Sequence, residues 1–109
     1  MSKFDDLLGK YETELKGSGK KGAVNGEQLK AIAKGLGPSI YNKDSSLVAC
    51  SDQAELDRVK NNFLIKKLGL KDGPQLDAAI KSVCEEYDSR SKYRAVFYYM
   101  LAQKLGQSV

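Results

Sequence analysis

Glycine and proline divide this sequence into about five stretches in which apolar residues recur every three or four positions. Such spacing places the apolar side chains on one face of a helix. No stretch alternates with a period of two over enough residues to predict a strand. The sequence therefore predicts an all-α fold, a compact bundle of about five helices. The expected helices span residues 2–16, 25–35, 52–68, 74–87 and 92–105.

Two of these helices, near 52–68 and 92–105, carry apolar residues on several sides. A helix that is apolar on several sides is buried on several sides, so we expect these two at the centre of the bundle. In the second, Tyr98 and Tyr99 point away from the main apolar stripe. Aromatic residues are enriched at interface cores, and these two are therefore candidate protein-interface residues.

The chain has 109 residues, which is the usual length of one domain, residues 1–109. A chain of this size can bury roughly two-thirds of the surface that it exposes when unfolded. Its hydrophobic share of 41% and charged share of 29% are ordinary for a globular protein. The sequence therefore predicts a small domain with one core that folds without a metal or a cofactor.

Residues with special backbone preferences gather in the stretch KGLGPSIYN, residues 34–42. Gly35 is expected to end the second helix in the left-handed conformation, which would cost another residue about 1–2 kcal/mol. Gly37 and Pro38 then turn the chain, because proline cannot continue a helix and restricts the residue before it. Tyr41 is expected to return to the core and anchor the turn.

Other helix ends have recognisable signals. Asp52 and Glu55 have the spacing of a capping box, and Asp72 is the expected cap of the helix that begins near residue 74. Gly69 and Gly106 are expected to stop the third and fifth helices.

Cys50 and Cys84 are the two cysteines of the chain. The stretch MSKFDDLLGKY has acids where a signal peptide would need an apolar core. The longest apolar run, residues 95–102, is much shorter than the roughly 20 residues of a membrane span. We therefore expect a cytoplasmic protein without membrane association, with both cysteines reduced and acting as small hydrophobic residues.

The sequence has no histidine, which excludes Ser-His and Cys-His nucleophile pairs and every histidine-containing metal site. Gly19 and Lys20 lack the Ser or Thr and the preceding strand of a phosphate-binding loop. We therefore predict a protein that is not an enzyme, with no catalytic, cofactor-binding or metal-binding residues. An enzyme that uses only Lys, Tyr and carboxylates has no positive signal here.

Lysine and arginine are concentrated in two segments without acids, residues 58–71 and 89–109. If these segments share a face, they form a polyanion-binding surface. Its candidate residues are Lys66, Lys67, Lys71, Arg90 and Arg94. The interpretation that we favour is that these side chains point several ways and cover apolar neighbours. A helix-turn-helix is disfavoured because the expected fourth helix exposes more acids than bases, which would repel phosphates.

Three stretches, KGLGPSIYN, CSDQAELDRVKNNFLIKKLGLKDG and KYRAVFYYMLAQKLG, resemble a family of small bacterial proteins known only as a domain of unknown function. The resemblance runs from Lys3 to Gly106. It implies a compact bacterial helical domain and assigns no catalytic or binding residues.

The sequence leaves two functions open. The first is a small non-enzymatic interaction or structural domain that binds an unknown protein partner or associates with itself. The alternative is weak, sequence-independent binding of nucleic acid or another polyanion through the Lys/Arg surface, with a steep salt dependence.

Overall fold

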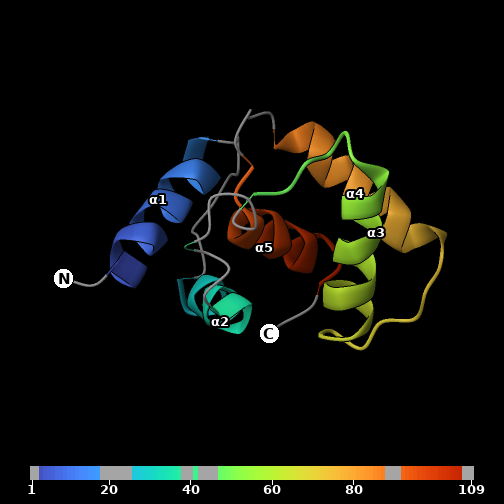
Figure 1. Ribbon diagram of the computed structural model, residues 1–109, viewed down its shortest axis with the longest axis horizontal. Coiled ribbons are helices and arrows are strands. Elements are labelled where there is room, and N and C mark those ends of the chain that lie inside the picture. The colour runs from blue at the N-terminus through green and yellow to red at the C-terminus, as the bar shows by residue number, and fades with distance from the viewer. Residues whose placement is uncertain (1–2, 18–25, 38–40, 42–46, 88–91, 107–109) are drawn as a thin grey trace.

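The computed structural model describes residues 3–17, 26–37, 41, 47–87 and 92–106. Within these ranges five α-helices and one π-helical segment follow one another (Figure 1). They are α1 (Lys3–Gly17), α2 (Gly26–Leu36), α3 (Gln53–Val59), η2 (Lys60–Ile65), α4 (Pro74–Glu86) and α5 (Arg94–Lys104). The described ranges contain no strand, only one isolated antiparallel bridge between Leu47 and Tyr93. The predicted all-α bundle of about five helices is confirmed.

Helix α5 is the centre of the bundle, as predicted. Every residue from Ala95 to Ala102 is buried, because α1, α2 and α4 all pack against α5 (Figure 1). Tyr98 and Tyr99 are only 6% and 0% exposed, so the prediction that they form an exposed protein interface is wrong. The extra apolar sides of α5 are covered by its neighbours. No helix in the described ranges is long and apolar enough to cross a membrane.

The segment predicted as one helix over 52–68 is built from α3 and η2. The side chain of Asp52 caps α3 by accepting a hydrogen bond of 3.0 Å from the backbone N–H of Ala54, as predicted. Glu55 does not close the capping box. Its carboxylate turns away toward Arg58 and Arg94.

In η2 the helix widens, and the backbone N–H of Lys66 bonds to the carbonyl of Asn61, five residues back, at 3.2 Å. Such π-helical turns are rare and are often found at functional sites. Phe63 and Leu64 are consecutive and both buried. The ring of Phe63 stacks on the ring of Tyr98 from α5, with centroids 4.2 Å apart. Val59, Phe63 and Leu64 are the buried residues of α3 and η2, and the other residues of these two elements are exposed or half-buried. The central position predicted for two helices is therefore found for α5, whereas the segment 52–68 is buried along one part only.

Two predicted helix stops are confirmed and one predicted cap is wrong. Gly69 and Gly106 have φ angles of +71° and +68°, in the left-handed region that favours glycine. Asp72 does not cap α4, since Gly73 occupies the N-cap position without a side-chain hydrogen bond. Asp72 instead lies 3.3 Å from the ammonium of Lys60 on η2.

Helix α2 ends later than predicted. Gly35 lies inside α2 and outside the left-handed region, whereas Gly37 has a φ of +62°. The stop is therefore Gly37, and the prediction for Gly35 is wrong. Leu36 extends the apolar face of α2 and packs against the core. Tyr41, expected as a core anchor, is 52% exposed. Pro38 lies outside the described residues.

Replacing these two glycines by alanine should have opposite effects on stability. Gly37→Ala should lower the free energy of unfolding by about 1 kcal/mol because of its left-handed backbone. Gly35→Ala should raise it by about 0.5 kcal/mol, since alanine is the better helix former. The nearest atom to a new Cβ at Gly35 is the mobile Nζ of Lys67, at 3.3 Å. Urea unfolding of both variants measures the difference, and an equal loss in both would contradict the assignment of Gly37 as the stop.

A disulfide joins Cys50 to Cys84, with Cα atoms 5.9 Å apart. It ties the segment before α3 to the C-terminal half of α4. The prediction of two reduced cysteines is therefore wrong. The spacing along the chain gave no sign of the pair, because only the packing of the segment before α3 against α4 brings the two residues together.

Candidate functional site

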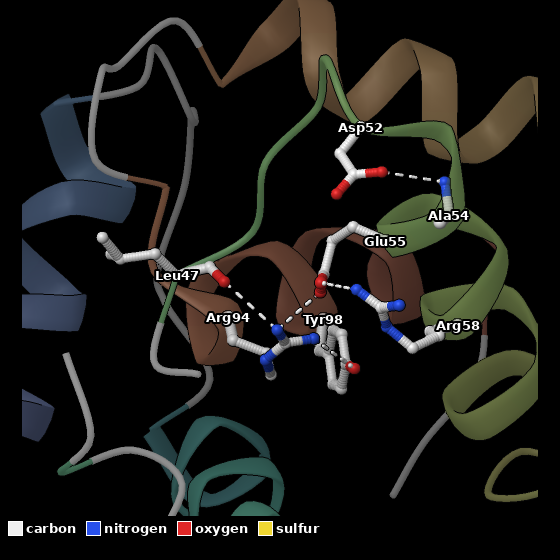
Figure 2. A network of polar contacts seen from close by, with 7 residues as sticks. All are labelled: Leu47, Asp52, Ala54, Glu55, Arg58, Arg94 and Tyr98. Carbon is white, nitrogen blue, oxygen red and sulfur yellow. Dashed lines mark hydrogen bonds and ion pairs between the residues drawn. The ribbon is translucent and has the colours of Figure 1, made fainter. Parts of the chain in front are cut away.

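A polar network links α3, the segment before it and the start of α5 (Figure 2). The guanidinium of Arg94 donates hydrogen bonds to the Glu55 carboxylate at 2.5 Å, the Leu47 carbonyl at 3.1 Å and the Tyr98 hydroxyl at 3.1 Å. Glu55 also accepts a hydrogen bond of 2.7 Å from Arg58. The side chains of Glu55 and Arg94 are only 13% and 14% exposed. The network therefore fixes Arg94 within the protein.

Burial and charge act in opposite directions on the pKa of Glu55. Burial alone would raise this pKa, but the hydrogen bonds and positive charges of Arg58 and Arg94 outweigh it and hold the pKa below its ordinary value. Burial raises the pKa of the Tyr98 hydroxyl, and Arg94 offsets only part of that rise. At neutral pH the network therefore holds an ionised Glu55 and a neutral Tyr98.

A cavity of about 210 Å³ lies between α2, η2 and α5, and Tyr98 forms part of both its wall and the network. Its lining is largely apolar. The strongly polar groups are the amide of Asn62 and the ammonium of Lys67. The lining residues are Ile32, Gly35, Leu36, Asn62, Phe63, Lys67 and Tyr98. Because Arg94 holds the Tyr98 hydroxyl and Phe63 stacks on the Tyr98 ring, this aromatic wall has one fixed orientation.

Lys67 brings a positive charge to this cavity. Its Nζ atom lies 3.3 Å from the position that a Cβ on Gly35 would occupy, in the last turn of α2. The C-terminal end of a helix carries partial negative charge, which favours an ammonium there. The end of the Lys67 side chain therefore lies close to Gly35 in the last turn of α2, a contact that the sequence interpretation did not foresee.

The structure separates the residues of the predicted polyanion surface. Lys66, Lys67 and Lys71 are exposed at the end of η2 and just after it. Arg94 is half-buried and its guanidinium is held in the network, so its assignment to an exposed surface is wrong. Arg90 lies outside the described residues.

Acids from other segments reach several cations of the two acid-free segments. Lys60 lies 3.3 Å from both Asp72 and Asp77, and Lys104 lies 2.5 Å from Glu86. These ion pairs reduce the positive charge that the two segments present. They favour the interpretation that the cations point several ways.

Sequence reasoning missed both the network and the cavity. The spacing of Arg94 and Tyr98, one helical turn apart, was a possible signal for their contact. Nothing in the sequence connects Glu55 to Arg94, 39 residues further along the chain. No group of three or more His, Cys, Asp or Glu side chains that could hold a metal ion occurs among the described residues.

These features define a class of protein, a small all-helical domain with an apolar cavity whose aromatic wall is held by a largely buried ion pair. A family model described as "Protein of unknown function (DUF2853)" matches residues 10–108, and the chain belongs to this family. The predicted resemblance to a family of unknown function is thereby confirmed. A comparison with curated proteins finds no significant match.

Proposed function

We propose that this domain is a non-enzymatic binding module for a small molecule with one aromatic ring and one carboxylate. The observation that carries the proposal is the cavity of about 210 Å³ between α2, η2 and α5. Its walls include the buried side chains of Ile32, Phe63 and Tyr98, whereas Lys67 and Asn62 are exposed. A ligand would therefore place its apolar part inside and its charge at the mouth.

The size of the cavity matches such a ligand. An apolar cavity of about 150 Å³ is large enough to hold benzene, so a volume of about 210 Å³ has room for a ring with a short polar substituent. Phe63 and Tyr98 both line the cavity, and a third aromatic ring can pack against this pair. A carboxylate beside Lys67 would gain a charge-assisted hydrogen bond.

Binding rather than catalysis is supported by how the nearby titratable groups are used. Glu55 and Tyr98 both bond to Arg94, and this arrangement holds the wall of the cavity in place. The sequence predicted an interaction or structural domain without naming its partner, and the proposal specifies a small ligand as that partner. We also propose the bacterial cytoplasm as its compartment. Reducing thiols there would make the Cys50–Cys84 bond a transient, redox-active link and not a permanent one.

Titration with phenylacetate, followed by NMR on the isotope-labelled full chain, tests this proposal. We expect shifts at the residues that line the cavity. Lys67→Met should weaken binding about tenfold through loss of one charge-assisted hydrogen bond. Lys66→Met is the matched control, because Lys66 is an exposed neighbour that does not line the cavity. Benzylamine, with the same ring and the opposite charge, should bind more weakly than phenylacetate.

Two results would count against this proposal. One is the absence of cavity shifts at millimolar phenylacetate. The other is equal weakening by Lys66→Met and Lys67→Met, which would mean that only the general positive charge of this region matters. Binding of duplex DNA at physiological salt that is lost when Lys66, Lys67 and Lys71 are changed to Glu would instead support the polyanion alternative.

A further inference from the structure

A second hollow, of about 370 Å³, surrounds the disulfide between α3 and α4. It shares no lining residue with the cavity described above. Its walls combine both cysteines with two apolar and three polar side chains. The lining residues are Cys50, Gln53, Leu56, Asp77, Ile80, Lys81 and Cys84. Both cysteines are only partly buried, so the bond faces a space that a small molecule can enter.

We propose that this hollow is a thiol–disulfide exchange site for a low-molecular-weight thiol that carries carboxylate groups. The apolar part of the thiol would lie against Leu56 and Ile80, and a carboxylate would pair with Lys81. This inference is independent of the proposed ligand cavity, because it uses other residues and another chemistry.

The charges around the hollow favour an anionic thiol. The carboxylate of Asp77 lies 3.3 Å from the ammonium of Lys60, so part of its negative charge is compensated from η2. Lys81 is exposed and forms no ion pair with any residue that the structure describes. A carboxylate that enters the hollow therefore finds a cation beside the sulfur atoms.

The exchange proceeds in two balanced steps. The thiolate attacks one cysteine sulfur, the sulfur–sulfur bond of the protein breaks, and a mixed disulfide forms. The other cysteine leaves as a thiolate and takes a proton from water. A second thiol then attacks the mixed disulfide, which gives the oxidised dimer of the small thiol and a second protein thiol. The two small thiols thus supply the two electrons that reduce Cys50 and Cys84.

The test uses the oxidised full chain under native conditions, with glutathione as the anionic thiol and 2-mercaptoethanol as the neutral thiol. Mass spectrometry follows the mixed disulfide and the reduced protein, and each rate is divided by the rate of the same thiol with an unstructured disulfide peptide. We expect the normalised rate to be higher for glutathione. Lys81→Glu should lower it about fivefold, the size of a modest ion pair, and should slow 2-mercaptoethanol less, because both thiols attack as thiolates but only glutathione also carries carboxylates. Lys71→Glu, at an exposed lysine outside the hollow, should change neither rate.

Three outcomes would overturn the proposal. The first is equal normalised rates for the two thiols. The second is an equal slowing by Lys81→Glu and Lys71→Glu, which would reflect the total charge of the protein. The third is a rate of reduction that does not depend on thiol concentration, because the bond would then become accessible only when the protein opens.

Discussion

Replacing Cys50 and Cys84 together by alanine is expected to lower the free energy of unfolding of the oxidised protein by about 4 kcal/mol. The disulfide closes a loop between residues 34 apart in the sequence, and in the chain-entropy account a loop of this length strongly restricts the unfolded state. Urea unfolding of the oxidised wild type and of the double variant measures the difference. We expect this loss of unfolding free energy to be larger than the loss caused by any other substitution proposed for this protein.

Reductant provides the control for this experiment. Adding it should bring the wild type close to the stability of the double variant, and it should leave the variant unchanged. If the difference persists in reductant, the loss comes from the packing around residues 50 and 84, and the cross-link contributes little.

Arg94→Met should lower the free energy of unfolding by about 3 kcal/mol. The change leaves the largely buried carboxylate of Glu55 without its inner partner, and it removes the donor to the Leu47 carbonyl and the Tyr98 hydroxyl. Arg58→Met is the matched control, because it removes the exposed partner of the same carboxylate. We expect a much smaller effect from that variant, and similar losses in both would contradict the special role of Arg94.

The stability difference between the wild type and Arg94→Met should also depend on pH. The lowered pKa of Glu55 means that its ion pairs stabilise the folded state above the unfolded pKa of about 4.3. This stabilisation is lost as the pH falls through the lower folded pKa. Urea unfolding at pH 7 and near pH 3 should therefore show a smaller difference at the acidic pH. A constant difference would assign the loss to packing of the long Arg94 side chain.

The helices themselves could be predicted from the sequence because their apolar spacing reflects local geometry. The stops at Gly69 and Gly106 and the cap at Asp52 follow from chemistry within a few residues of each helix end. The exact end of α2 could not be predicted in this way. Gly35 and Gly37 are both suitable stops, and the choice between them depends on Leu36, which packs against the core.

The candidate sites depend on contacts between distant parts of the chain, and for this reason they escaped prediction. Tyr98 looks exposed on a helical projection, but η2 brings Phe63 over its ring. Arg94 has the sequence context of a surface cation, but α3 brings Glu55 against it. The sequence predicted which residues are apolar or charged, whereas the packing of α3, η2 and α4 decides which of them meet.

The central position of α5 has a consequence for how the protein is made on the ribosome. Helices α1, α2 and α4 each pack against α5, yet all three precede it in the chain. During synthesis at about 5–20 residues per second, these helices emerge before the helix that covers their apolar faces. Until residues 94–104 leave the exit tunnel, the nascent chain contains the helices that surround the core but lacks the central helix against which they pack.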